Sequence, residues 1–239
     1  MKLMNFEHSE DLFSWAAHNF VEMGKAACAE NPFFNVALSG GKTAQSFFAK
    51  LREEGGISSL MAKTRFFTSD ERAVDLNSPQ SNAGNAWREL LQPLSVSPTN
   101  FFPMFDEKHT PAEAATIYQQ KLFELLPQNA NKIPVFDVIY LGLGEDGHTA
   151  SLFPHSELLS DLNDQDLVKA SVDAPAGFVR ITFMPSLILA AKHISIMVTG
   201  ANKAGILDDV LHGPLMPEQW PAQYILRAKH PNLTLLTAL

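Results

Sequence analysis

Residues Phe136–Pro154 read FDVIYLGLGEDGHTASLFP. The first residues of this stretch, Phe136–Leu141, form a short apolar run rich in β-branched and aromatic side chains, which is typical of a buried strand. The run ends in a glycine-rich segment, where the backbone can turn sharply and another molecule can come close to it. Open α/β sheets bind their ligands at the carboxyl ends of the strands, so this segment is a candidate site.

Strands and helices alternate along the rest of the chain. Short apolar runs predict further strands at Phe33–Leu38, Thr64–Thr68, Leu167–Val172, His193–Thr199 and Asn232–Thr237, with a short edge strand at Phe101-Phe102. Helical patterns cover Asn5–Glu30, the residues from Ala44 onward, Thr110 to about Leu126, and Lys203–Leu211. Gly55–Ala62 is expected to be a connector. The alternation predicts an α/β protein with a mostly parallel sheet flanked by helices, in a single domain over residues 1–239.

Composition limits the classes of partner. Lysine and arginine number 18 against 26 aspartate and glutamate, a formal net charge of −8. This acidic balance argues against nucleic acid or a membrane surface, whereas a few local cations are enough for a small anionic molecule. Cys28 stands alone, which excludes an internal disulfide and indicates a reducing, cytoplasmic setting. The N-terminus lacks the pattern of a signal peptide, and no apolar run approaches membrane-spanning length. Both a monomer and a homodimer stay open.

Four polar segments follow predicted strands. We call them the glycine turn (Ser39–Thr43, SGGKT), the SDER segment (Ser69–Arg72), the histidine loop (Gly142–Ser151) and the lysine loop (Gly200–Lys203). Because the carboxyl ends of parallel strands lie at one edge of a sheet, the four segments are expected to converge. This convergence is a stronger signal than any single motif.

The glycine turn is a candidate phosphate cradle, made of Ser39, Gly40, Gly41, Lys42 and Thr43. A turn between a strand and a helix points backbone N–H groups and a helix N-terminus at an anion. The spacing of a Walker loop is missing, and glycine pairs are also common in ordinary turns. Lys42 either adds a cation to the cradle or points to solvent.

Three further cations accompany these segments. Lys203, at the start of a helix, suits a phosphate because its charge adds to the positive end of the helix dipole. Arg180 can make a bidentate phosphate contact, and Arg72 can meet the phosphate or hold Asp70 in place. The alternative for Lys203 is a solvated lysine, and the alternative for Arg180 is a surface salt bridge. For Arg72 the alternative is a self-paired charged turn at Asp70-Glu71-Arg72.

Asp146 and His148 are the sharpest pair of candidates. A histidine titrates near neutral pH, which suits a general base that activates water, and a carboxylate can fix its tautomer. Because the two residues are only two positions apart, Asp146 either pairs with His148 or binds substrate hydroxyls. A metal site is the alternative, with His155 nearby, but no HxH, HExxH or cysteine partner completes a ligand set. The GxSxG elbow of a nucleophilic serine is also missing.

Six motifs together resemble the 6-phosphogluconolactonase family. They are SGGKT at 39–43, SDERAV at 69–74, SN at 81–82, GLGEDGHTASLFP at 142–154, RIT at 180–182 and GANKA at 200–204. They occur in order from Ser39 to about Leu211. The resemblance implies an α/β fold related to glucosamine-6-phosphate deaminases and ribose-5-phosphate isomerases. It also implies hydrolysis of 6-phosphoglucono-δ-lactone in the oxidative pentose phosphate pathway, with a sugar phosphate as substrate and no metal or organic cofactor.

The residues of the four segments and the family resemblance together predict the residues of the site. His148 matches the family's general base, Asp146 and Asp70 match acids of its pocket, and these three are the predicted catalytic residues. The predicted substrate-binding residues are Ser39, Gly40, Gly41, Lys42, Thr43, Arg72, Gly144, Arg180 and Lys203, of which Arg180 and Lys203 match phosphate positions. Lys42 and Ala44 depart from the family's glycine turn, and Tyr224–His230 departs from its C-terminal pattern, in a part expected to be peripheral to catalysis.

Two other functions fit parts of the pattern. The related deaminases carry GHIAFNEP, and Phe153 stands where their glutamate supports the ring-opening histidine. A phenyl ring cannot hydrogen-bond an imidazole as a carboxylate does, so hydrolysis is favoured over deamination and isomerisation. A non-catalytic sugar-phosphate sensor is disfavoured because a basic helix-turn-helix extension is missing and His148 is present.

Overall fold

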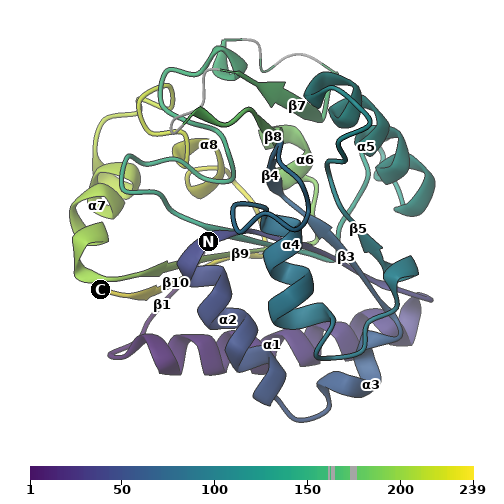
Figure 1. Cartoon of the computed structure of the whole chain (residues 1–239). Helices are drawn as coiled ribbons and strands as arrows, with labels where there is room; N and C mark the ends of the chain where they lie inside the picture. The colour runs from purple at the N-terminus through teal and green to yellow at the C-terminus, as the bar shows by residue number, and fades with distance from the viewer. Residues whose placement is uncertain (161, 163–164, 173–176) are drawn as a thin grey trace.

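The central sheet is parallel throughout. The computed structural model describes residues 1–160, 162, 165–172 and 177–239, and within them seven strands form this sheet (Figure 1). In spatial order they are β1 (Lys2–Asn5), β10 (Leu233–Ala238), β9 (His193–Thr199), β6 (Val138–Gly142), β2 (Phe34–Leu38), β3 (Thr64–Thr68) and β5 (Phe101–Phe102). Each neighbouring pair is parallel, which confirms the predicted fold class.

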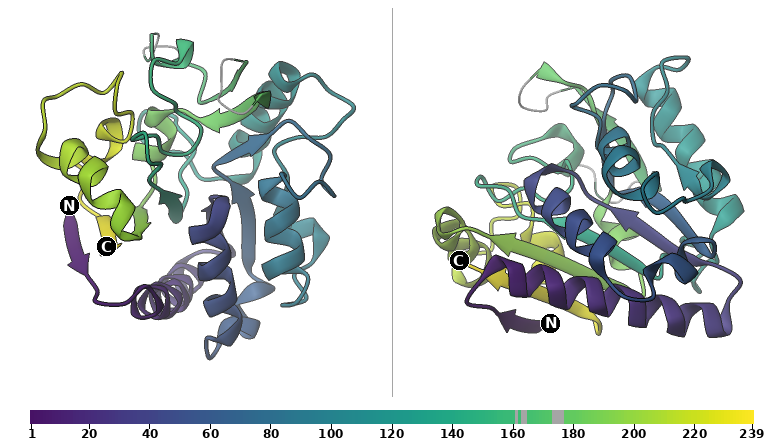
Figure 2. Two further views of the ribbon diagram at one scale, coloured as in Figure 1. Left: turned by 60° about the vertical axis from the view of Figure 1, so that its left-hand side comes forward. Right: turned by 60° about the horizontal axis from the view of Figure 1, so that its bottom comes forward.

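Helices cover both faces of this sheet (Figures 1 and 2). On one face lie α1 (Ser9–Glu30), α2 (Gly41–Glu53), α3 (Ile57–Met61) and α4 (Asn82–Ala86), which continues into a π-helical turn at Trp87–Leu91. On the other face lie α5 (Pro111–Leu125), α6 (Pro185–Leu189), α7 (Ala204–His212) and α8 (Gln223–Leu226). Single-turn 3-10 helices occupy Pro98–Asn100, Glu157–Leu159 and Ala201–Lys203.

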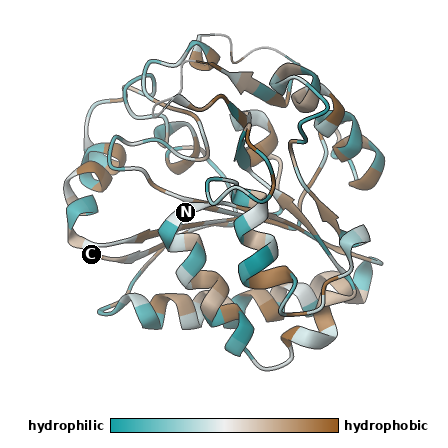
Figure 3. Ribbon diagram, in the orientation of Figure 1, coloured by the Kyte–Doolittle hydropathy of each residue, from teal (hydrophilic) through white to brown (hydrophobic). Residues whose placement is uncertain are grey.

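The two faces have separate cores because strand side chains alternate between them. In β6, Val138 and Tyr140 pack beneath α1 and α2, whereas Ile139 and Leu141 pack on the opposite side. The inner strands, such as β2 and β6, are therefore buried on both faces, which explains their continuous apolar runs. Figure 3 shows the consequence for the helices, which carry both hydrophilic and hydrophobic residues. Among the described residues, no helix is both long and apolar enough to cross a membrane.

A second, smaller sheet stands above the carboxyl edge of the first. It contains β4 (Asp70–Arg72), β8 (Arg180–Phe183) and β7 (Val168–Ser171), paired antiparallel in that order. No pattern in the sequence predicts this sheet. Asp70–Arg72 of the SDER segment, for which a self-paired charged turn was an alternative, is a strand because it pairs with β8, a partner more than a hundred residues away.

Several predicted boundaries shift. The first helix begins at Ser9, inside the predicted segment Asn5–Glu30, whose first residue belongs to β1. The residues expected as a connector include α3. The helix after the glycine turn begins at Gly41 instead of Ala44, so Lys42 and Thr43 lie in its first turn. The N-cap Thr110 and Glu113 form a capping box at the start of α5, which confirms the predicted start of that helix.

Candidate active site

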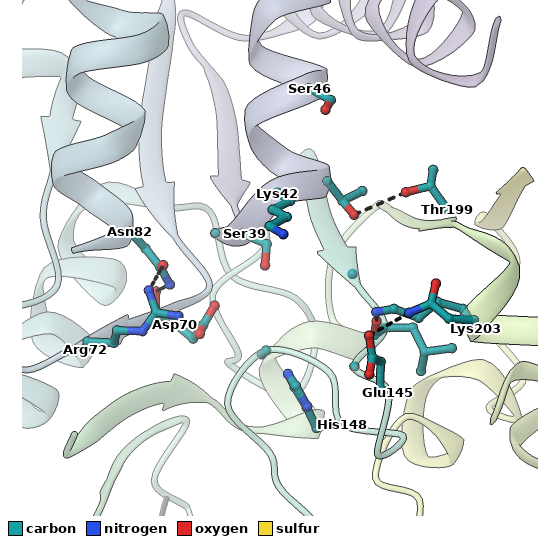
Figure 4. Close-up of a pocket in the computed structure, with 18 residues that line it drawn as sticks. Ser39, Lys42, Ser46, Asp70, Arg72, Asn82, Glu145, His148, Thr199 and Lys203 are labelled. Atoms are coloured by element: carbon teal, nitrogen blue, oxygen red, sulfur yellow. Dashed lines mark hydrogen bonds between the residues drawn. The ribbon is translucent and has the colours of Figure 1, made fainter. Parts of the chain in front are cut away.

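One cavity of about 510 Å³ lies at the carboxyl edge of the central sheet, and residues of the four predicted segments line it (Figure 4). A volume of this size is typical of small-molecule sites. The predicted site residues in its wall are Ser39, Gly40, Gly41, Lys42, Thr43, Asp70, Arg72, Gly144, His148 and Lys203. Two others, Asp146 and Arg180, lie outside the wall: Asp146 contacts His148, and Arg180 is paired with Arg72 across β4 and β8.

His148 is held by Asp146. The carboxylate Oδ1 of Asp146 lies 2.5 Å from the ring Nδ1 of His148 and also accepts from the backbone N–H of His148 at 3.1 Å. A carboxylate accepts and does not donate, so Nδ1 carries the hydrogen and Nε2 is left as the basic nitrogen. The pairing that the sequence left open is therefore present, and His148 points into the cavity with 31% of its side chain exposed (Figure 4).

The same contact changes the acidity of Asp146. Partial burial alone would raise the pKa of this carboxyl, but hydrogen bonds and charge from His148 outweigh burial and hold the pKa below its usual value. Asp146 is therefore ionised at neutral pH, where it can stabilise a protonated imidazole.

Glycines give the histidine loop its shape. Gly144 donates its N–H to the carbonyl of His148 at 2.8 Å, and a Cβ at Gly144 would lie 2.0 Å from Nδ1 of His148. Gly147 has a positive φ of 84°, which favours glycine, and it packs against Trp220. The loop thus depends on glycine at the two positions that surround the imidazole.

An aromatic contact supports the other side of the imidazole. The ring of Phe153 lies 4.6 Å from that of His148, centroid to centroid, and the guanidinium of Arg180 lies 5.7 Å from the Phe153 ring. Arg180 is only 6% exposed, and its Nε has no hydrogen-bond partner among the described residues. Burial and the charge of Arg72 lower the pKa of Arg180, opposed by Asp70 and Glu71. The predicted phosphate ligand Arg180 is thus buried outside the cavity wall.

Two cations lie on the side of the cavity formed by the lysine loop and the glycine turn. Lys203 donates from Nζ to the carbonyl of Leu143, across the gap between two loops. Burial lowers the pKa of Lys203, and the nearby charges of Glu145 and Asp146 oppose that shift. Lys42 projects from the first turn of α2 (Figure 4). A hydroxyl contact of 3.5 Å between Thr43 and Thr199 links the glycine turn to the end of β9.

Arg72 and Asp70 form the opposite side of the cavity. Arg72 donates from Nη1 to the carbonyl of Gln80 at 2.7 Å, and Asp70 accepts from the hydroxyl of Ser151 at 2.7 Å. The second bond ties the small sheet to the end of the histidine loop. Asp70 is also within 3.3 Å of the hydroxyl of Ser69. This arrangement replaces the self-paired charged turn that was the alternative in the sequence.

Several residues of the wall were not predicted: Ser46, Asn82, Glu145, Thr199 and Asn202. Asn82 fills the space beside Gly40, where a Cβ would lie 1.9 Å from its Oδ1. Glu145 accepts from the side-chain amide of Asn202 at 2.6 Å, which joins the histidine and lysine loops. Polar residues inside the quoted motifs SN and GANK were the available signal for Asn82 and Asn202.

Among the described residues, no group of three or more histidine, cysteine, aspartate or glutamate side chains is placed to hold a metal ion. The side chains of the cavity offer a carboxylate-supported imidazole on one wall, with ammonium and guanidinium groups around it. Such a set can activate a water molecule beside a bound anion.

The chain is similar in sequence to known proteins. The sequence model of a family described as "Glucosamine-6-phosphate isomerases/6-phosphogluconolactonase" matches residues 7–235. The 6-phosphogluconolactonase of Synechocystis sp. is 34% identical over 199 residues, which cover 83% of this chain and 80% of that protein. The enzyme of the same name from Treponema pallidum is 37% identical over 179 residues, covering 75% of this chain and 73% of its own.

Solved structures extend the similarity to the fold. A 6-phosphogluconolactonase from Trypanosoma brucei superposes with a TM-score of 0.85 at 28% identity, covering 99% of this chain and 95% of that one. A monomeric glucosamine-6-phosphate deaminase shares the fold with a TM-score of 0.80 at 20% identity, covering 99% and 97%. The fold is thus common to both activities.

Proposed function

Because the chain belongs to the glucosamine-6-phosphate isomerase/6-phosphogluconolactonase family and is an enzyme of the 6-phosphogluconolactonase class, we propose that it hydrolyses 6-phospho-D-glucono-1,5-lactone to 6-phospho-D-gluconate. The observation that supports this most is the Asp146–His148 pair, which leaves Nε2 of His148 basic inside a cavity lined by Lys42, Arg72 and Lys203. The substrate has an ester to hydrolyse at one end and a dianion to hold at the other, and this cavity offers a base for the first and cations for the second.

The phosphate docks on Lys203 and the glycine turn. The first turn of α2 starts inside that turn, so its backbone N–H groups and the positive end of the helix dipole add to the charge of Lys203. Anchoring the phosphate there places the lactone carbonyl near His148, so remote binding energy is used to orient the reacting atoms. The predicted phosphate contact of Arg180 stays a prediction, since its guanidinium packs on Phe153 behind the wall.

His148 then acts as a general base and later as a general acid. Its Nε2 takes a proton from water, and the resulting hydroxide attacks C1 of the lactone. Backbone N–H groups of one of the glycine segments stabilise the oxyanion, a role whose removal typically costs on the order of 100- to 1000-fold in rate. The imidazolium, stabilised by Asp146, protonates the departing ring oxygen, which opens the lactone and returns the histidine to its neutral form.

A direct assay tests the proposal. Purified protein is mixed with the lactone, and acid release is followed against spontaneous hydrolysis and against His148→Ala. Rate enhancement by the wild-type protein and its loss in the variant are expected. Ammonia release from glucosamine 6-phosphate would instead favour the deaminase activity, which we do not expect because Phe153 contacts the imidazole where a carboxylate would be required. Tight binding of sugar phosphates without turnover would favour a sensor.

The proposal extends to the setting of the enzyme. We expect a cytoplasmic protein, since its single cysteine, Cys28, is free, and one that does not bind nucleic acid, since its formal net charge is −8. We also expect residues 1–239 to fold as one domain, as a monomer or a homodimer. Cell fractionation and light scattering of the purified protein check these expectations.

A further inference from the structure

Glu71 is a buried carboxylate next to the cavity, outside the set of residues that line it. It lies in β4 between Asp70 and Arg72, which both belong to the wall, and it is only 2% exposed. A carboxylate removed from water costs free energy unless hydrogen bonds compensate it. Burial raises the pKa of Glu71, and its hydrogen bonds oppose that shift.

Four donors surround the Glu71 carboxylate. Oε1 accepts from the backbone N–H groups of Arg72 and Asn82, each at 2.7 Å. Oε2 accepts from the backbone N–H of Ala83 at 2.8 Å and from the hydroxyl of Ser81 at 2.9 Å. Three of these donors come from the N-cap and first turn of α4, and the fourth comes from β4 itself. The carboxylate thus joins the start of the helix to the strand.

The helix start that Glu71 holds carries Asn82, which reaches into the cavity wall. Oδ1 of Asn82 lies 3.3 Å from Nη1 of Arg72, and its Nδ2 donates to the carbonyl of Asp70 at 3.0 Å. The same side chain fills the space against Gly40 of the glycine turn. Figure 4 shows Asn82, Arg72 and Asp70 grouped on the side of the cavity away from Lys203. Asn82 therefore relays the position of the helix to three predicted site residues.

We propose that Glu71 is a positioning residue for substrate binding: by fixing the start of α4 against β4, it sets Asn82 and, through Asn82, the guanidinium of Arg72. This inference rests on the proposed function for its kinetic test. It predicts that Glu71 affects binding of the substrate more than proton transfer at His148, since none of the hydrogen bonds described for its carboxylate goes to the histidine loop. If Glu71 were needed only for folding, its substitution would not affect substrate binding and proton transfer differently.

The test is a double-mutant cycle on steady-state kinetics. Glu71→Gln keeps the shape but turns an NH₂ group toward N–H donors, so we expect KM to rise about tenfold, with kcat within about twofold of wild type. Arg72→Ala should raise KM as well. If Glu71 acts through Arg72, adding Glu71→Gln to Arg72→Ala should change KM by less than about threefold, because the two effects share one path. Additive effects on KM, or a loss in kcat alone, would overturn the proposal.

A matched control is available in α5. Glu113 accepts hydrogen bonds from the backbone N–H and hydroxyl of Thr110 in a capping box away from the cavity. Glu113→Gln should lower the thermal midpoint and leave KM unchanged. If Glu71→Gln does not fold, Ser81→Ala decides, because it loosens the same start of α4 by removing one donor to the carboxylate together with the N-cap bond from Gly84, while leaving the backbone donors. A rise in KM of about two- to threefold supports the proposal, and an unchanged KM overturns it.

Failure of the positioning proposal can be told from failure of the proposed function. If the wild-type protein hydrolyses the lactone but Glu71→Gln leaves KM unchanged, the function stands and the positioning role falls. If wild-type protein does not hydrolyse the lactone, a crystal structure of Glu71→Gln decides whether Glu71 positions Asn82 and Arg72. Displacement of Asn82 and of the Arg72 guanidinium would support the proposal, and unchanged positions would overturn it.

Discussion

Asp146 and His148 are close in sequence, yet their spacing alone did not establish that they pair. The histidine loop turns back on itself because Gly144 leaves room for the imidazole, and this turn brings Nδ1 of His148 to the carboxylate of Asp146. The sequence could name the two residues and their chemistry. It did not single out Asn82 or Glu145 within the quoted motifs, because their place in the wall depends on contacts between segments that are far apart in the chain.

The hydrogen bond from Nδ1 leads to a prediction for Asp146 and His148. His148→Ala should lower kcat by about 10²- to 10⁴-fold with little change in KM, because a general base is lost while the cations remain. Asp146→Asn should lower kcat less, because an amide no longer enforces the hydrogen on Nδ1. Steady-state kinetics on the lactone measures both. Thermal unfolding serves as the control, and an unfolded His148→Ala variant would contradict the expectation that the fold is intact.

Lys203 holds the phosphate in the proposed mechanism, so removing its charge should weaken substrate binding. Lys203→Met keeps the aliphatic stem and removes the charge, so we expect KM for the lactone to rise about ten- to a hundredfold, with a smaller effect on kcat. The matched control is Lys25→Met, which removes a lysine that pairs with Glu22 on the surface of α1. Wild-type affinity for the phosphorylated substrate in Lys203→Met would contradict the anchoring role.

At the scale of elements, strands β2, β3, β6 and β9 could be predicted because each is a short apolar run buried on both faces. The small sheet could not, because β4 is polar and its pairing with β8 comes from tertiary contact. β1 was not predicted either. It is mostly exposed, so its sequence shows no buried face. Hydrophobic patterns in a sequence indicate burial, so they do not predict an element that forms by strand pairing alone.

The segment before α8 supports the histidine loop. The N–H of Ala222 donates to the carbonyl of Gly147 at 2.9 Å, and Trp220 packs on the same glycine. Trp220→Ala should therefore loosen the loop and lower kcat about tenfold, with KM little changed, since misplacing a catalytic group slows chemistry. The control for lost packing is Trp15→Ala, because Trp15 is a tryptophan of α1 that packs on Phe6. Equal effects of the two variants on kcat would contradict this role of Trp220.

At the scale of the whole molecule, His193 couples stability to pH. It lies at the start of β9, on the sheet edge away from the cavity, and burial lowers its pKa from the ordinary 6.5, with Asp137 opposing the shift. The unfolded chain therefore takes up a proton below about pH 6.5 that the folded protein resists, so the free energy of unfolding falls as pH falls through that range.

Removing the imidazole should remove that part of the pH dependence. We expect His193→Asn to lose less of its free energy of unfolding between pH 7.5 and 5.5 than the wild-type protein, as measured by urea denaturation at both values. His212→Asn is the control, because His212 is exposed and pairs with Asp208 on the surface of α7. A wild-type slope in His193→Asn would contradict the assignment.

The edge strand β1 pairs with β10, so the first residues of the chain lie beside the last. Met4 is aligned with Leu236, and the hydroxyl of Thr237 donates to the side chain of Asn5 at 2.5 Å. During synthesis on a ribosome, β2, β3 and β6 emerge early enough to assemble while translation continues. Residues 2–5 have no edge to join until residues 233–238 leave the exit tunnel. The first strand of the sequence can therefore join the sheet only after the last one has been synthesised.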